Sequence, residues 1–563
     1  MSCDSKDAEM YEIKPNGAAG REHGVTWDVS DEEAAPRPRP TSWVDGFRRA
    51  ETLHVISHKT PYIQTAPPDM HAGMGSHHYD LGAANIKTAS TALARELKGR
   101  HLQMIAFGGS IGTGVFVASG GSLAIGGPAS LFLAFFLHGI FQYNFWIPLG
   151  ALLWDGRAYT INYWDGYLSK AIFVAVFLAL IMIINLFGVK AYGEAEFVFS
   201  IIKIMGVVGF ILLGAAINVG GHPDSGYIGW QYWHDPGAFN NGFKGFCTVM
   251  VNSSGAFAGT ELIGLAAAEA ANPRKSLPSA IKQVFWRISI FYCTALLLIG
   301  LLVPYTDPRL LGSTSSSDAL ASPFVIAIES AGITIVPSIM NVIILIAVVS
   351  VGNSAVYGSS RTLLALAEQS HAPRIFAYVD RQGRPVVAIL LACLIGLLAF
   401  LADVEENAII FSWLLSTSGL CMLFTWGSIC LCHIRFRKAW AYSGHSLEQL
   451  PFRSSVGVNG SWFAFAGFAM ILVAQVWIGI WPLSVPNTPG ARCQAFFLRA
   501  MALPIVLGSY MVHKLWFRTQ LVRTAKMDIN TGRRYFRSHI TNEQEREEQL
   551  SWPLWKKVYN FLC

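Results

Sequence analysis

Charged residues are scarce in this sequence of 563 residues: they make up 14% of it, whereas hydrophobic residues make up 52%. A soluble globular protein carries roughly 25% charged residues. Apolar runs long enough to cross a bilayer as helices recur between residues 102 and 515. The short alternating segments of a membrane barrel are missing. We therefore predict an all-α polytopic membrane protein embedded in the lipid bilayer.

Signatures of several other protein classes are missing as well. The 9 cysteines are scattered without a Cys-x-x-Cys pair, which speaks against a disulfide framework or a zinc site. There is no metal-ligand cluster, nucleophile elbow or pair of catalytic carboxylates, so we expect no metal, no cofactor and no enzyme activity. The net charge of +6 comes without a nucleic-acid-binding motif, so we expect no nucleic acid partner. Because residues 1–100 are polar, we expect no signal peptide.

The chain divides into two tails and a membrane domain. Residues 1–100 hold a Pro-Arg repeat at 36–40 and no periodic apolar face, which predicts a disordered cytosolic tail. The membrane domain is expected at 101–515 and a cytosolic C-terminal tail at 516–563. About twelve spans are predicted, at 102–119, 124–141, 143–163, 169–188, 196–218, 243–268, 284–304, 323–350, 385–402, 408–432, 461–484 and 493–515.

The charges of the loops predict the orientation. Arg95, Lys98 and Arg100 precede the first span, which places the N-terminus inside by the positive-inside rule. The same rule makes the basic segments cytoplasmic, namely 269–287, 351–384, 433–460 and the C-terminal tail. The mostly acidic segments are predicted to lie outside the cell, namely 219–242, 305–322 and 403–407. We therefore predict that both termini are cytoplasmic.

One region is too short for the predicted topology. Residues 124–164 must hold two crossings and a turn, although a span needs about 20 residues. Asp155 and Arg157 also lie within the second of these runs. Either the second and third spans form a cramped hairpin or this region does not span properly.

The first span is interrupted by glycine. Four glycines occur among the seven residues Gly108–Gly114, and each weakens a helix by about 1 kcal/mol relative to alanine. Broken backbone at membrane depth is tolerated only where it is buried in protein or lines a cavity. The run therefore predicts a broken helix beside a transported ligand.

The sixth span carries a matching interruption at Gly255 and Gly259, followed by Glu261. The two spans correspond if spans one to five repeat as six to ten, as in transporters built from inverted repeats. A broken helix exposes N–H groups that attract a carboxylate and C=O groups that suit an ammonium. A free amino acid carries both charges. The alternative is that these glycines only allow close helix packing.

Two ionisable side chains lie within apolar runs. Glu261 is deep enough in the sixth span that its charge is costly, which indicates a function. Lys203 lies several residues into the fifth span. It either extends to the cytoplasmic interface or lies where a sodium-coupled transporter would hold an ion, and then exchanges protons during the transport cycle.

Particular stretches resemble the fungal amino acid permeases. RHLQMIA at 100–106 opens a segment through Gly114 that is similar to the start of their membrane domain. The stretch 256–278, which contains EAANPRKS, is typical of the same family, as are 359–363 and 433–436. The resemblance covers residues 95–563 and is of the general amino acid permease type. These proteins belong to the amino acid–polyamine–organocation superfamily.

The resemblance implies the LeuT-type fold, with two inverted repeats of five helices and two further helices. It implies proton-coupled import of amino acids across a fungal plasma membrane. Lys203 and Glu261 are expected to link proton transfer to the transport cycle, and Ser418 to tune the preference for substrate side chains. The residues expected to bind the substrate backbone are Ser110, Ile111, Gly112, Thr113, Gly114, Phe257, Ala258, Gly259 and Thr260.

The chain departs from the family pattern within residues 124–164. The family has a longer second span, a loop and the start of the third span there, whereas this chain passes from Phe141 almost directly to Gln142–Asn144. Roughly one helix, about 20 residues or more, is missing through a gene-model error or a real deletion. A real deletion would truncate the second and third spans and put transport in doubt.

The tails leave two questions open. The N-terminal tail of 100 residues motivates a second hypothesis, a non-transporting amino acid sensor that signals through cytosolic regulators bound to its tails. The terminal Cys563 lies beside Phe561 and resembles the S-palmitoylated end of these permeases. An unmodified thiol is the alternative.

Overall fold

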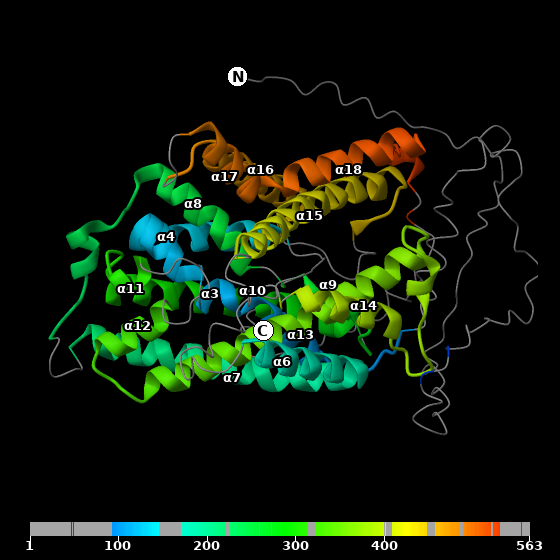
Figure 1. Cartoon of the computed structure of the whole chain (residues 1–563). Helices are drawn as coiled ribbons and strands as arrows, with labels where there is room; N and C mark the ends of the chain where they lie inside the picture. The colour runs from blue at the N-terminus through cyan, green and yellow to red at the C-terminus, as the bar shows by residue number, and fades with distance from the viewer. Residues whose placement is uncertain are drawn as a thin grey trace, which may run out of the picture.

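The described part of the chain is helical, as predicted (Figure 1). Within that part the β pairing is limited to two isolated bridges, Arg49 with Asp380 and Leu97 with Ala270. The computed structural model describes residues 47, 49, 93–116, 118–145, 170–220, 226–257, 259, 261–271, 273–311, 322–398, 400, 408–447, 456–483, 488–518, 522–527, 529 and 553.

The helices follow the order of the predicted spans. The first half comprises α2 (Gly99–Ser110), α3 (Thr113–Phe116), α4 (Ala118–Phe145), α6 (Lys170–Leu186), α7 (Val189–Asn218), α8 (Gly242–Ala256) and α9 (Leu262–Ala267). The second half comprises α10 (Pro273–Leu302), α12 (Pro323–Ser330), α13 (Val336–Glu368), α14 (Val386–Gly396), α15 (Ala408–Tyr442), α16 (Gly457–Ile480), α17 (Pro489–Ala500) and α18 (Ala502–Phe517). Short helical turns connect them at η3 (Trp233–Gly237), α11 (Pro308–Leu311), η5 (Arg374–Ala377) and η9 (Thr524–Lys526).

Among the described residues, 4 helices are long and apolar enough to cross a membrane singly, namely those in α4, α7, α13 and α16. The pair α17 and α18 also qualifies, bent by 66°. Shorter apolar helices occur at Ile172–Leu186, Ser289–Leu302 and Val386–Gly396. These helices agree with a multi-pass membrane protein, whereas the count of twelve spans stays a prediction.

Several boundaries of the predicted spans are wrong, and two of them change the path of the chain. The turn after the first span lies at Gly127 (φ 78°) and Pro128 within α4, rather than at 120–123. This left-handed backbone favours glycine, and proline cannot continue the hydrogen bonding of a preceding helix. The predicted eighth span, 323–350, is in fact two helices, because α12 ends near Gly332 (φ 74°) and α13 runs on to Glu368. The end of α13 was predicted as a loop because of Arg361, which the fold buries.

The broken helices lie inside the bundle. Figure 1 shows α6 and α7 along one side and α15 to α18 along the opposite side, with α3, α9 and α10 between them. Helix α2 packs against α7, α10 and α13, and α4 packs against α8 and α10. The site built on the broken helices is therefore surrounded by other helices.

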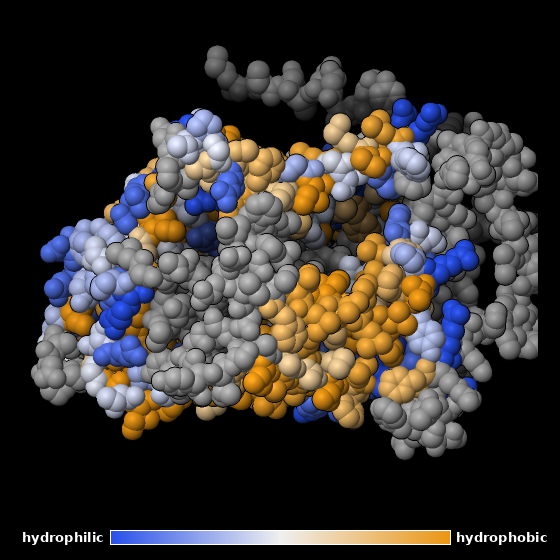
Figure 2. All heavy atoms as spheres, in the orientation of Figure 1, coloured by the Kyte–Doolittle hydropathy of each residue, from blue (hydrophilic) through white to orange (hydrophobic). Residues whose placement is uncertain are grey.

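One face of the molecule carries a broad apolar area. Figure 2 shows a broad hydrophobic area with hydrophilic residues gathered toward the ends. On α6 the exposed Ile172, Val176, Leu180 and Ile183 are spaced three or four residues apart and so share one helix face. An apolar face of this extent is typical of contact with lipid.

Candidate substrate and coupling site

The first predicted break is confirmed. Helix α2 ends at Ser110, and Ile111 follows with extended backbone (φ −75°, ψ 95°) before α3 begins at Thr113. The last carbonyls of a helix have no partner within the helix. Here the Gly108 carbonyl accepts a hydrogen bond from Lys203, and the Ser110 carbonyl accepts one from Tyr292. Side chains from other helices therefore satisfy the broken end.

The second predicted break is also confirmed. Helix α8 ends at Ala256, and α9 begins at Leu262. Between them Gly259 adopts a left-handed backbone with φ 89°, a conformation that costs a glycine little and other residues about 1–2 kcal/mol. Ala258 and Thr260 lie outside the described residues. The polar residue that closes this break is Glu261.

The two breaks cross each other in direct backbone contact. A Cβ atom added at Gly259 would overlap the Gly109 carbonyl and lie 2.9 Å from the Gly109 Cα. A Cβ atom at Gly114 would overlap the backbone of Ala256. The glycines of both runs are therefore needed for this crossing. The structure therefore agrees with both interpretations of the glycines: they break the two helices, and they allow the close packing that brings the two breaks together.

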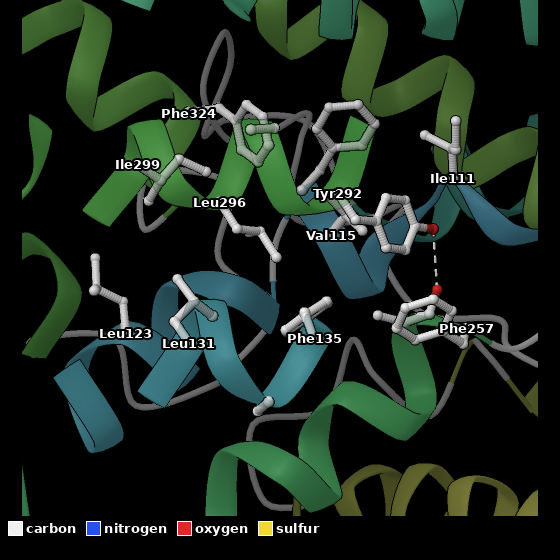
Figure 3. Packing of buried hydrophobic residues seen from close by; sticks show 14 of the residues in the cluster. Ile111, Val115, Leu123, Leu131, Phe135, Phe257, Tyr292, Leu296, Ile299 and Phe324 are labelled. Carbon is white, nitrogen blue, oxygen red and sulfur yellow. Dashed lines mark hydrogen bonds between the residues drawn. The ribbon is translucent and has the colours of Figure 1, made fainter. Parts of the chain in front are cut away.

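One hydroxyl bridges the two broken ends. Tyr292 of α10 is buried, and its hydroxyl oxygen lies 2.7 Å from the Ser110 carbonyl oxygen and 3.1 Å from that of Ala256. Figure 3 shows the bond to the carbonyl beside Phe257 as a dashed line. These carbonyls belong to the last residues of α2 and α8. Tyr292 carries no signal in the sequence, because its partners are 182 and 36 residues away.

Glu261 lies at the second break and is buried. Its Oε1 accepts a hydrogen bond of 3.0 Å from the backbone N–H of Gly259. The carboxylate therefore holds the strained turn before α9. This contact gives Glu261 a structural role in addition to the predicted proton-linked one, which stays a prediction.

Lys203 does not extend to the membrane interface, because its side chain is 0% exposed. Its Nζ donates hydrogen bonds of 2.7 Å to the Gly108 carbonyl and 2.9 Å to Ser350 Oγ. Lys203 thus joins the fifth span to the broken end of α2 and to α13. This placement is the one that the coupling hypothesis requires, although proton transfer itself is untested.

A buried carboxylate, Glu196, accompanies Lys203 on α7. Its Oε2 accepts a hydrogen bond of 2.5 Å from Ser350 Oγ, and its Oε1 accepts one of 2.7 Å from Asn353. Asn185 of α6 extends this network by donating to Asn353 over 2.8 Å. Buried charges are tolerated when they are paired and hydrogen-bonded. Glu196 and Lys203 are therefore groups of opposite charge, and the Ser350 hydroxyl contacts both of them.

The spacing of Glu196 and Lys203 in the sequence is the signal that could have identified Glu196. Glu196 precedes Lys203 by seven residues, or two helical turns, so both side chains project from one face of a helix. The predicted fifth span began at residue 196, which placed Glu196 at its edge. Because α7 begins at Val189, Glu196 lies inside the helix instead.

A buried ion pair links the end of α9 to α13. Arg361 Nε lies 3.3 Å from Glu269 Oε2, and these residues are 4% and 0% exposed. The Tyr357 hydroxyl donates to the same oxygen over 2.5 Å. Backbone hydrogen bonds of 3.1 and 3.0 Å join Leu97 to Glu269 and Ala271. The start of α2, the end of α9 and α13 are thus held together.

His138 lies behind the second break. It is buried on α4, and its ring stacks on Phe257 at 4.9 Å between centroids. Trp426 and Phe468 complete the aromatic surroundings at 5.7 and 6.1 Å. Both ring nitrogens of His138 lack a hydrogen-bond partner among the described residues. Burial of a polar group without a hydrogen-bond partner costs free energy.

Several predicted features cannot be placed. Ser418 belongs to α15, but its side chain lies outside the described part. Cys563 and residues 146–169, which include the second part of the region 124–164, also lie outside it. In the N-terminal tail, the Phe47 ring lies 4.5 Å from the Arg384 guanidinium, and the Phe47 carbonyl accepts a hydrogen bond from Tyr378. That part of the tail contacts the segment between α13 and α14.

Comparisons with known proteins agree with these features. The amino acid permease family matches residues 101–158 and 155–526. The general amino-acid permease GAP2 of Candida albicans is 45% identical over 99% of this chain and 100% of its own length. The general amino-acid permease GAP1 of Saccharomyces cerevisiae is 46% identical over 85% of this chain and 87% of its own.

Solved structures show a more distant likeness. Mhp1, a nucleobase-cation-symport-1 family transporter, is 17% identical, covers 76% of this chain and 90% of its own, and has a TM-score of 0.33. The family assignment depends on the sequence relatives, which are permeases rather than enzymes. With such identity over nearly its whole length, the chain belongs to the amino acid permease family.

Proposed function

We propose that this chain imports amino acids across the plasma membrane by proton symport. Its twelve spans would form a LeuT-type 5+5 inverted repeat with two further helices and with both termini in the cytoplasm. The observation that carries the proposal is the crossing of two broken helices at Gly109 and Gly259, beside the buried Lys203. Membership of the amino acid permease family supports the substrate class.

The substrate backbone would bind where the two breaks cross. The carbonyl ends of α2 and α8, at Ser110 and Ala256, suit the α-ammonium group. The backbone N–H groups around Gly112–Gly114 suit the α-carboxylate. Ala258 and Thr260 stay proposed substrate contacts at the second break, where Glu261 already accepts the hydrogen bond from the Gly259 N–H. These contacts involve only the part that all amino acids share. Side-chain preference would then come from neighbouring residues, with Ser418 as one candidate.

Proton coupling would act through the pair of Lys203 and Glu196. Protonated Lys203 donates a charged hydrogen bond to the Gly108 carbonyl, and bonds of this kind contribute about 1.5–3 kcal/mol. Loss of the proton would weaken the connection between α7 and the broken end of α2. Because Ser350 contacts both charged groups, it offers a path for the proton between them. Glu261 is the second candidate for a proton-linked group.

Uptake into proteoliposomes tests the transport proposal. Vesicles with purified protein and an alkaline interior are given a mixture of labelled amino acids. We expect accumulation above the external concentration, and loss of that accumulation when the pH gradient is collapsed. Binding without accumulation would overturn the proposal and would favour a sensor.

A pair of lysine variants tests the coupling. Lys203→Met removes the buried ammonium, whereas Lys190→Met removes an exposed one from the same helix. We expect Lys203→Met to retain exchange of labelled for unlabelled amino acid but to lose accumulation driven by the pH gradient. Lys190→Met and the wild type should accumulate equally. Normal proton-driven accumulation by Lys203→Met would remove Lys203 from the coupling mechanism.

The truncation of the second and third spans remains a proposal. The alignment with GAP2 extends over 609 positions, more than the 563 residues of this chain. This difference supports a missing segment without locating it. Sequencing of the transcript across residues 124–164 would distinguish a deletion from a gene-model error. S-acylation of Cys563 and binding of regulators to the tails are further proposals, testable by labelling with a palmitate analogue and by tail-truncation variants.

A further inference from the structure

Tyr292 occupies a chemically unusual position for a hydroxyl group. Its oxygen lies within hydrogen-bonding distance of two carbonyl oxygens, those of Ser110 and Ala256. Each of these carbonyls is the last in its half-helix, so neither has a partner within its own helix. A phenol has one proton to donate. The Tyr292 hydroxyl therefore donates to one carbonyl at a time and alternates between the two.

The position of the hydroxyl is set by packing. The Tyr292 ring lies 5.2 Å from the ring of Phe257 and 6.2 Å from that of Phe135, distances typical of favourable aromatic pairs. Figure 3 shows the three rings together between α4, α8 and α10. The side chain is about 1% exposed, so water does not compete for its proton. The surrounding rings therefore hold the hydroxyl between the two carbonyls.

An ammonium group would need the same two acceptors. It carries three donors and a positive charge, and hydrogen bonds from charged donors are stronger than those from a neutral hydroxyl. A substrate ammonium between Ser110 and Ala256 would lie close to the present place of the Tyr292 oxygen. The two donors cannot both occupy that place.

We infer that the Tyr292 hydroxyl stands in for the substrate ammonium when the site is empty. It donates to the carbonyl end of α2 or of α8 and is displaced when an amino acid binds. This inference rests on the proposed function. Tyr292 is then a residue that sets affinity for the common part of every substrate. Its effect is the same for substrates with unlike side chains.

The test compares Tyr292→Phe with Tyr305→Phe. The control removes an equivalent bond, because the Tyr305 hydroxyl donates to the Pro236 carbonyl over 3.0 Å in a connecting segment. KM and maximal rate are measured for leucine and glutamine, and 4-methylpentanoate, which is leucine without its amino group, serves as a competitive inhibitor. Elution of each variant as a monodisperse peak in detergent checks that it folds.

Removal of a competing donor lowers KM. We expect Tyr292→Phe to lower KM by about two- to tenfold, the equivalent of one net hydrogen bond, and by the same factor for leucine and glutamine. The inhibition constant of 4-methylpentanoate should not change, and Tyr305→Phe should match the wild type. An unchanged or raised KM, or loss of uptake by a folded Tyr292→Phe protein, would overturn the inference.

A second variant covers the case in which Tyr292→Phe does not fold. Incorporation of 3-fluorotyrosine at position 292 keeps the ring and makes the hydroxyl a better donor, so KM should rise. A KM that is equal to or below the wild-type value would contradict the inference. Failure of the proposed function looks different, because the wild type and Tyr305→Phe would then show no saturable uptake at all.

Discussion

The crossing of the two breaks predicts that Gly259→Ala is far more harmful than Gly255→Ala. At Gly259 the backbone has φ 89°, which costs an alanine about 1–2 kcal/mol. The new methyl group would also overlap the Gly109 backbone, and overpacking of this kind costs about 1–3 kcal/mol. Together these effects lower the free energy of unfolding by about 2–5 kcal/mol, a large part of a typical total of about 5–15 kcal/mol.

Gly255 provides the matched control. It lies in the same segment, within α8, and a Cβ atom there would have open space within 4 Å. Because alanine favours a helix more than glycine does, Gly255→Ala should gain about 0.5–1 kcal/mol. Both variants are purified in detergent, and their thermal unfolding midpoints and KM for uptake are compared.

We expect Gly259→Ala to have a lower midpoint and a raised KM, because the methyl group separates the two broken ends. Gly255→Ala should keep the wild-type KM and a midpoint at least as high. Equal midpoints and equal KM values for the two variants would refute the argument that backbone contact at Gly109 holds the site.

Contacts other than the crossing itself give three more predictions. Glu269→Gln leaves the Arg361 charge buried without its counter-ion, so unfolding should become easier by about 3–5 kcal/mol; a thermal midpoint equal to that of the wild type would contradict this. His138→Phe removes two buried nitrogens that have no partner among the described residues, so the midpoint should stay equal or rise, and a clear fall would indicate an essential contact of the imidazole. The hydrogen bond from Arg309 lowers the pKa of Asp307, against a smaller opposing effect of burial. The ion pair therefore stabilises the folded state fully above the ordinary aspartate pKa of about 4, and this stabilisation is lost as the pH falls through the lowered pKa of folded Asp307. The thermal midpoints of the wild type and Asp307→Asn should therefore differ at neutral pH and converge in acid. A difference between the midpoints that stays constant with pH would contradict the assignment.

The sequence was most informative where a local rule applied. Four glycines at 108–114 and the glycine at 259 predicted both breaks, because helix propensity depends on the residues themselves. Lys203 was identified by its rarity in an apolar run, but its partners were not, since Gly108 and Ser350 are 95 and 147 residues away. Contacts at such separation depend on how the helices pack, which hydropathy does not describe.

The errors had equally specific causes. Arg361 and the polar residues near it suggested a loop after residue 350, but Glu269 and Tyr357 pair with the guanidinium inside the protein. A hydropathy pattern does not distinguish buried charges from exposed ones, so the predicted end of the eighth span at residue 350 is too early. Gly127 and Pro128 lie within an apolar run, so the turn there gave no signal in hydropathy, although its Gly-Pro pair is a turn signal.

The backbone pairing of Leu97 with Glu269 and Ala271 has a consequence for mutagenesis. Its two hydrogen bonds use only main-chain atoms, so alanine scanning of the region would detect Glu269 and Arg361 but would miss this connection entirely. Only a residue without an N–H group removes one of its donors. Leu97→Pro and Ala271→Pro each remove one of the two bonds, so the double variant tests whether the start of α2 and the end of α9 must move as one body.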